Sequence, residues 1–194
     1  MRALAVLLVA GLFSTIARAA EPPPPTLRAT AREGPIAIDG RLDEPDWTRA
    51  TPGFRFVERS PTPGALAPDG HEVRVLVDAQ ALYVGVRMPL PDGRPPRALE
   101  LTRDSFDVFD DDAVSLKIDI RADQRTTVGF VINAEGTQLD YLALESGKQF
   151  RREYDAVWTA ETHVDSDAWY AEFRLPVAAL GVPNARRDVI GINV

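Results

Sequence analysis

Six aspartates lie between Asp104 and Asp119, and the second half of that segment alternates apolar and polar residues as a half-buried strand does. Carboxylates bind hard cations and accept hydrogen bonds from hydroxyl groups, so the segment is suited to calcium or to a polyhydroxylated ligand. The candidate calcium ligands are Asp104, Asp107 and Asp110, although their spacing is not that of an EF-hand. The alternative is a solvated acidic loop without a ligand.

Aromatic rings within this polar segment are the second candidate feature. Phe106 and Phe109 stand among the aspartates. Exposed aromatic rings stack on the apolar faces of pyranose sugars, while carboxylates, amides and guanidinium groups bond the hydroxyls. Trp47 and Trp169 are interpreted as structural, because one pins a helical turn to a sheet and the other shares the apolar face of its strand. Phe109 and Phe106 are therefore the better stacking candidates.

Several kinds of catalytic or cofactor site lack the residues that they need. The chain has no cysteine and two histidines, His71 and His163, so a zinc site or a thiol nucleophile is not expected. No serine elbow motif lies near the histidines, and no pair of carboxylates is set apart by its spacing. Haem ligation by Met88 and a histidine is not expected, nor is a nucleotide. The sequence predicts a non-catalytic domain.

The N-terminus has the pattern of a secretory signal. An apolar run follows Arg2, and Ala17-Arg18-Ala19 places small residues where a signal peptidase cleaves. Residues 1–19 are therefore predicted to be a signal peptide and residues 20–34 a proline-rich leader; an uncleaved anchor is the alternative. Loss of Arg2 and Arg18 changes the formal net charge from -7 to -9, which disfavours nucleic acid as a partner.

The rest of the chain alternates with the period of β-strands. Expected strands lie at residues 73–77, 82–86, 114–120, 126–133, 137–142, 157–164 and 169–175. Asp43 is expected to cap a helical turn that contains Trp47, and a second turn is expected at Pro176–Leu180. The fold class is therefore an all-β antiparallel sandwich of up to eight strands with one or two short helical turns. It forms one domain, residues 35–194, interpreted as truncated because residues 189–194 look like a strand without a following turn.

Four blocks of sequence resemble family 9 carbohydrate-binding modules. They are Ile36-Ala-Ile-Asp39-Gly40-Arg-Leu42-Asp43-Glu44-Pro-Asp-Trp47, Leu82-Tyr83-Val84, Asp111-Asp112-Ala-Val114 and Trp169-Tyr-Ala-Glu172-Phe-Arg-Leu-Pro176. The resemblance implies a DOMON-like β-sandwich that binds carbohydrate without catalysis, often with structural calcium, in proteins associated with glycan breakdown. With Asp-Ala-Val-Trp158, the chain is most similar to a domain that precedes an outer-membrane barrel in a bacterial family.

The resemblance also implies a binding site. Its residues are Phe109, Asp111, Asp112 and Ser115, with Asn133 and Gln138 as neighbours. In sugar-binding members a tryptophan stands at the position of Phe109, a glutamate at that of Ser115 and an arginine at that of Val131. The second tryptophan of the family's clamp falls beyond Val194. Three positions of the implied site thus differ from the family pattern.

Two functions remain open from the sequence. The first is a non-catalytic carbohydrate-binding domain of a secreted or periplasmic bacterial protein linked to glycan recognition or breakdown. The second is a structural or interaction domain without a sugar ligand, continued into an outer-membrane β-barrel. In either case the protein is expected to cross the inner membrane and to be periplasmic or associated with the outer membrane.

Overall fold

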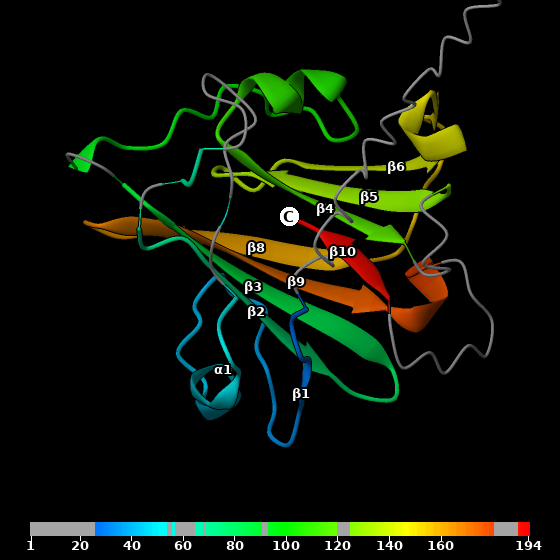
Figure 1. Ribbon diagram of the computed structural model, residues 1–194. Coiled ribbons are helices and arrows are strands. Elements are labelled where there is room, and N and C mark those ends of the chain that lie inside the picture. The colour runs from blue at the N-terminus through cyan, green and yellow to red at the C-terminus, as the bar shows by residue number, and fades with distance from the viewer. Residues whose placement is uncertain are drawn as a thin grey trace, which may run out of the picture.

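Two five-stranded sheets packed face to face form the fold (Figure 1). The computed structural model describes residues 26–53, 56, 65–67, 69–90, 93–119, 125–180 and 190–194. Sheet 1 has the order β1 (Thr30–Ala31), β2 (Glu72–Val77), β3 (Ala81–Pro89), β9 (Ala168–Pro176) and β8 (Thr159–Val164). Sheet 2 has the order β10 (Gly191–Asn193), β4 (Ala113–Asp119), β5 (Thr127–Asn133), β6 (Gln138–Leu144) and β7 (Gln149–Arg151). The predicted all-β sandwich is confirmed.

Pairing is antiparallel throughout both sheets except between β1 and β2, which run parallel. The two expected hairpins form as β2–β3 and β8–β9, and the three central strands of sheet 2 follow the predicted alternation. Sequence reasoning missed the short strands β1 and β7, while β10 is the strand expected near the end of the chain. Ile120 and the signal peptide lie outside the described residues.

Four short helices complete the described fold: α1 (Pro45–Arg49) and the 3-10 helices η2 (Phe106–Asp110), η3 (Glu145–Gly147) and η4 (Val177–Leu180). The two expected helical turns correspond to α1 and η4. The predicted cap is wrong, because Glu44 rather than Asp43 precedes α1 and no side chain caps its amides. Pro45 opens the helix instead, since it lacks the amide hydrogen that would need a partner there. No helix in the described ranges is long and apolar enough to cross a membrane.

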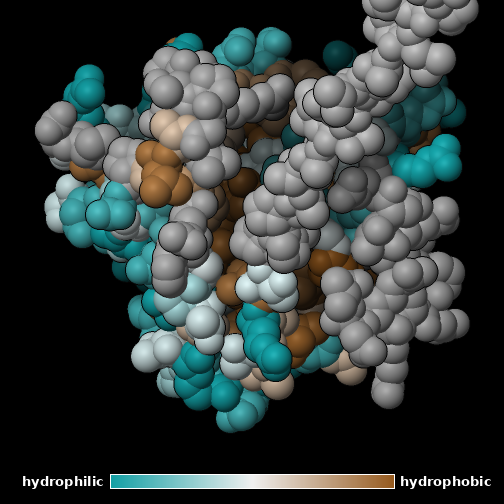
Figure 2. Space-filling view, viewed as in Figure 1, coloured by the Kyte–Doolittle hydropathy of each residue, from teal (hydrophilic) through white to brown (hydrophobic). Residues whose placement is uncertain are grey.

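The inward residues of both sheets form the main core. Val84, Phe130 and Phe173 are completely buried, and Trp158 stacks on Phe173 with ring centroids 6.0 Å apart. The buried indole nitrogen of Trp158 donates to Asp140 Oδ1 at 2.9 Å. In the space-filling view, hydrophobic residues are visible in the middle of this side of the molecule, and hydrophilic residues lie mostly toward its edges (Figure 2). The alternation in the strands thus places the core between the sheets.

The N-terminal segment closes the outer face of sheet 1. Leu42 and Trp47 pack over Gly85, where an added Cβ would lie 2.6 Å from Leu42 Cδ2. Glu172 projects outward from β9 and accepts hydrogen bonds from the Trp47 indole at 3.0 Å and from the amides of Asp39 and Gly40. Because these contacts cover the face, the central part of sheet 1 is not open to a ligand.

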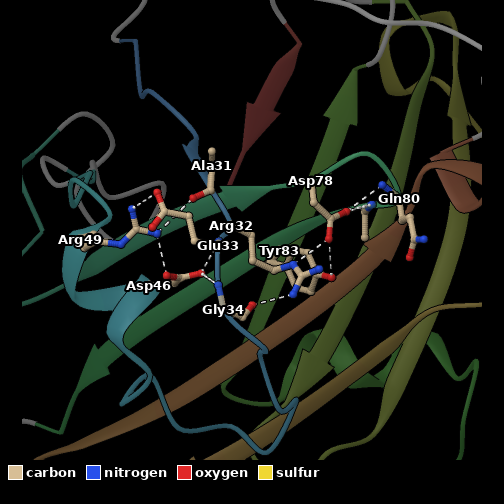
Figure 3. A network of polar contacts seen from close by, with 10 residues as sticks. Ala31, Arg32, Glu33, Gly34, Asp46, Arg49, Asp78, Gln80 and Tyr83 are labelled. Carbon is tan, nitrogen blue, oxygen red and sulfur yellow. Dashed lines mark hydrogen bonds and ion pairs between the residues drawn. The ribbon is translucent and has the colours of Figure 1, made fainter.

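Ion pairs reinforce the same segment, as Figure 3 shows. Asp46 accepts from the amides of Glu33 and Gly34 and pairs with Arg49 at 2.6 Å, and these contacts lower its pKa to about 2. Arg32 pairs with Asp78 at 2.7 Å, where Asp78 also accepts from the Tyr83 hydroxyl. The network ties β1 and α1 to the β2–β3 turn.

Candidate functional site

The outer face of sheet 2 carries a cluster of aromatic rings. Tyr141 of β6 lies at its centre and contacts Phe106 and Phe109 from η2 and Phe150 from β7, with ring centroids 5.9, 6.2 and 5.5 Å away. We call these four rings, together with Arg152, the aromatic face. Its two most accessible rings are Phe109, 45% exposed, and Phe150, 49% exposed, whereas Tyr141 is buried. Large exposed rings fixed on a buried base are suited to stacking against a ligand.

A glycine beneath Tyr141 makes this arrangement possible. Gly129 of β5 lies directly opposite Tyr141 in the ladder, and an added Cβ would be 2.2 Å from Tyr141 Cζ. The tyrosine ring therefore lies flat across the glycine backbone rather than standing up from the sheet. Burial raises the pKa of Tyr141 above its ordinary value, which keeps its hydroxyl protonated. The cluster thus rests on a neutral, tightly packed base.

Helix η2 positions Phe106 and Phe109 above that base. Ser105 caps the helix, because its hydroxyl accepts from the Asp107 amide at 3.2 Å. Val108 is completely buried within the helix and packs with Val131 and Leu139 of the sheet. This anchor leaves Phe109 on the exposed side. The sequence prediction that Phe109 is accessible is therefore consistent with its surroundings, although the segment is a helix and not a loop.

The second half of the aromatic face comes from the segment at β7, which sequence reasoning missed. Phe150 pairs with Ala143 and contacts Tyr141 diagonally across the ladder. Arg152 follows directly after β7 and places its guanidinium 4.1 Å from the centroid of the Phe106 ring, which is a cation–π contact. A three-residue strand is too short for an alternation signal, so only the three-dimensional arrangement identifies these two residues.

Asp111 and Asn133, two of the predicted site residues, hold a loop in place. The Asp111 carboxylate accepts from the amides of Leu99 and Glu100, both at 2.9 Å, and from Asn133 Nδ2 at 2.9 Å. These hydrogen bonds lower the pKa of Asp111, and the Asp111 side chain is only 2% exposed. Asn133 also donates to the Glu100 carbonyl and accepts from the Thr137 amide. Both side chains thus have their hydrogen-bonding groups in use inside the protein.

Asp112 and Ser115 are two further residues of the predicted site. The exposed Asp112 accepts from the Arg97 amide at 2.7 Å and fastens the same loop. Ser115 projects from β4 on the outer face, where its hydroxyl lies beside that of Tyr141. The Ser115 oxygen is buried and has no hydrogen-bond partner of good geometry in the described part of the chain. Of the predicted polar residues, Ser115 is therefore the one placed under the aromatic face.

Gln138 lies away from the aromatic face. Its Nε2 donates to the Ala160 carbonyl of β8 at 2.9 Å, and its Oε1 accepts from Arg103 at 2.8 Å. Arg103 also pairs with the buried Asp140, whose pKa is raised by burial. Gln138 and Arg103 line an open hollow of about 380 Å³ together with Leu101, Glu135, Gly136 and Thr137. No aromatic residue lines it, so the hollow offers no stacking surface.

The candidate calcium ligands Asp104, Asp107 and Asp110 are exposed. Asp104 has a positive φ of 64° and lies 3.5 Å from Arg103, while Asp107 and Asp110 belong to η2. Among the described residues, no group of three or more carboxylate or imidazole side chains is arranged to hold a metal ion. The three aspartates as placed do not fit a calcium site, which needs six to eight oxygens around the ion. Calcium binding stays a prediction from the sequence.

Comparison with known proteins concerns the fold. Two solved structures of a family 9 carbohydrate-binding module from Caldicellulosiruptor kristjanssonii, one in complex with glucose and one with cellotriose, are similar to this chain, with TM-scores of 0.55 and 0.57. Both are 14% identical to it; the similarity covers 86% of this chain and 75% and 74% of theirs. No family model and no curated protein matches the sequence. The chain has the fold of a family 9 carbohydrate-binding module.

Proposed function

We propose that this chain is a non-catalytic carbohydrate-binding domain and that it binds its ligand on the aromatic face. The observation that carries the proposal is the pair of half-exposed phenyl rings, Phe109 and Phe150, fixed on the buried ring of Tyr141. Such rings cover the apolar faces of pyranose units while the sugar hydroxyls stay in water or meet nearby donors. The similar module structures contain glucose and cellotriose, which supports a glycan as the ligand.

The choice of face follows from what covers the other surfaces. The outer face of sheet 1 is occupied by Leu42 and Trp47, and the space between the sheets is filled by the main core. The hollow beside Gln138 is lined by Leu101 and polar residues, and Arg103 there already bonds Gln138 and Asp140. Among the described residues, the aromatic face combines exposed rings with a rigid base.

A binding role without catalysis agrees with the state of the acidic segment. A glycosidase needs one carboxyl group with a raised pKa as acid and a second carboxylate across the scissile bond. Asp111, whose side chain is 2% exposed, has a lowered pKa and accepts three hydrogen bonds from the protein. It therefore supports the loop and does not supply a proton.

Titration calorimetry and a glycan array test the proposal. Wild type is expected to bind at least one glycan at millimolar concentration or below, and Phe109→Ala is expected to weaken binding about threefold to tenfold, because stacking is worth roughly 0.5–1.5 kcal/mol. Val157→Ala is the matched control, since Val157 is 86% exposed and belongs to no ring contact. A folded wild type that binds no glycan, or a Phe109→Ala variant that binds as wild type does, refutes the proposal.

The cellular setting proposed for this function is the periplasm or the outer membrane, in a protein linked to glycan recognition or breakdown. The support is the signal-like pattern of residues 1–19, which lie outside the described part of the chain. Sequencing the N-terminus of the protein after expression with its natural leader tests the proposal. A chain that begins near Ala20 supports it, and a chain that keeps residues 1–19 contradicts it.

A further inference from the structure

The two exposed rings of the aromatic face are separate from one another. Phe109 and Phe150 each contact the Tyr141 ring, but no ring contact among the described residues joins them to one another. They come from separate elements, η2 and β7. One sugar ring stacked on Phe109 is therefore not also stacked on Phe150, whereas neighbouring units of one chain can cover both.

Arg152 supplies hydrogen-bond donors within the same face. Its guanidinium stacks on Phe106, which itself contacts both Phe109 and Tyr141. A guanidinium stacked on a ring keeps its N–H groups directed outward from its edge, where hydroxyl oxygens can accept from them. Among the described residues no carboxylate lies within ion-pairing distance of Arg152, and the side chain is exposed. Its donors are therefore available to a ligand.

Most polar residues of the site predicted from the sequence are not available to bond the hydroxyls of a sugar on this face. The hydroxyl oxygen of Ser115 is buried, and Val131 has no polar group and is completely buried. Asp111 and Asn133 have their hydrogen-bonding groups occupied by the loop from Leu99 to Glu100. A sugar on this face thus meets few hydroxyl partners from the predicted set, whereas the guanidinium of Arg152 lies 4.1 Å from the centroid of the Phe106 ring.

We infer that the aromatic face binds a segment of an extended oligosaccharide, with successive units over Phe109 and Phe150 and with Arg152 donating to hydroxyls between them. This inference rests on the proposed function and deepens it, since it specifies a chain of several sugar units as the ligand. Two weak stacking contacts in one ligand act together because the second forms intramolecularly once the first is made. Affinity therefore grows with chain length until both rings are covered.

Calorimetry with glucose, cellobiose, cellotriose and cellotetraose tests the inference on the whole chain. We expect the affinity of wild type to rise about tenfold or more from glucose to cellotriose, as two stacking contacts replace one. Phe150→Ala and Arg152→Ala are expected to remove most of this rise, so that each variant binds cellotriose little more tightly than it binds glucose. Phe150→Trp, which enlarges the ring, is expected to raise the affinity for cellotriose more than the affinity for glucose.

Arg151→Ala is the matched control. Arg151 is the exposed neighbour of both residues, but it lies opposite Leu142 and lines a separate hollow with Leu142, Leu144, Glu153 and Tyr154. It is expected to bind the whole series as wild type does. Circular dichroism and a thermal melt check that each variant is folded, which is expected because Phe150 and Arg152 are at an exposed edge.

The outcomes separate this inference from the proposed function. Equal affinity of wild type for glucose and cellotriose, with loss of binding in Phe109→Ala, overturns the inference and supports the proposed function. An unchanged length dependence in Phe150→Ala and Arg152→Ala overturns the inference as well. Absence of binding to every member of the series overturns it too, and absence of binding across the glycan array refutes the proposed function itself.

Discussion

The carboxyl group of Glu172 makes the stability of the domain depend on pH in a direction opposite to that of most carboxylates. Burial raises its pKa from 4.5 to about 7, although three N–H donors, from Asp39, Gly40 and Trp47, favour the ionised form. The negative charge of Glu44 adds to the rise. The side chain is completely buried, so no water contacts it to compensate the charge.

The magnitude follows from the two pKa values. Below pH 4.5 the group is protonated in both the folded and the unfolded state, and its contribution to stability is complete. As the pH rises toward 7 the unfolded chain releases the proton first, so the free energy of unfolding falls by about 3 kcal/mol in total. Glu172→Gln does not titrate. The difference in unfolding free energy, wild type minus Glu172→Gln, should therefore decrease by about 3 kcal/mol between about pH 4 and about pH 8.

Urea unfolding of both proteins across this pH range measures that difference. Groups with lowered pKa values, such as Asp46 and Asp78, lose their stabilising effect in acid in both proteins. Their contributions therefore cancel in the difference between the two unfolding free energies. Glu161→Gln is the control, because Glu161 faces Glu172 across the β8–β9 ladder but is exposed. A difference that stays flat from about pH 4 to about pH 8, or that increases, refutes the assignment of a raised pKa to Glu172.

Two further predictions concern the packing of the aromatic face and the acidic segment. Gly129→Ala is expected to lower the free energy of unfolding by about 1–3 kcal/mol and to weaken glycan binding, because the added Cβ would overlap the Tyr141 ring. Gly34→Ala is the control, because the atom nearest to a Cβ added there is 3.9 Å away. Equal melting temperatures of the two variants would contradict the close packing of Tyr141 on Gly129. A chelator is expected to leave the melting temperature unchanged, since the described carboxylates form no metal-holding group, whereas a fall that added calcium reverses would establish calcium binding.

The strands were predictable because one face of each is buried. The alternation of Val114, Leu116 and Ile118 with polar residues is a direct consequence of side chains that point to opposite faces of a sheet, and the structure buries all three. The helix η2 was not predictable in this way. Its five residues are shorter than one amphipathic repeat, and its single buried anchor, Val108, stands between acidic and aromatic residues.

The site was predictable only in part. The three aspartates that follow Phe109 suggested an exposed ring, and the ring is 45% exposed in the structure. The role of Asp111 depends on amides of Leu99 and Glu100, which are brought to it by the fold and not by any local pattern. Phe150 likewise joins the face only through the β6–β7 pairing. Contacts between distant segments decide which side chains remain free for a ligand.

The central claim, that a glycan binds on the aromatic face, is tested most directly by an amide NMR titration of the isotope-labelled chain with cellotriose. The account predicts that the largest shifts fall on the amides of η2, from Phe106 to Asp110, and on those from Gln149 to Arg152, which carry the two exposed rings. Shifts confined to the hollow around Leu101 and Gln138, or to the segment from Gly40 to Trp47, would place the ligand elsewhere and contradict the claim.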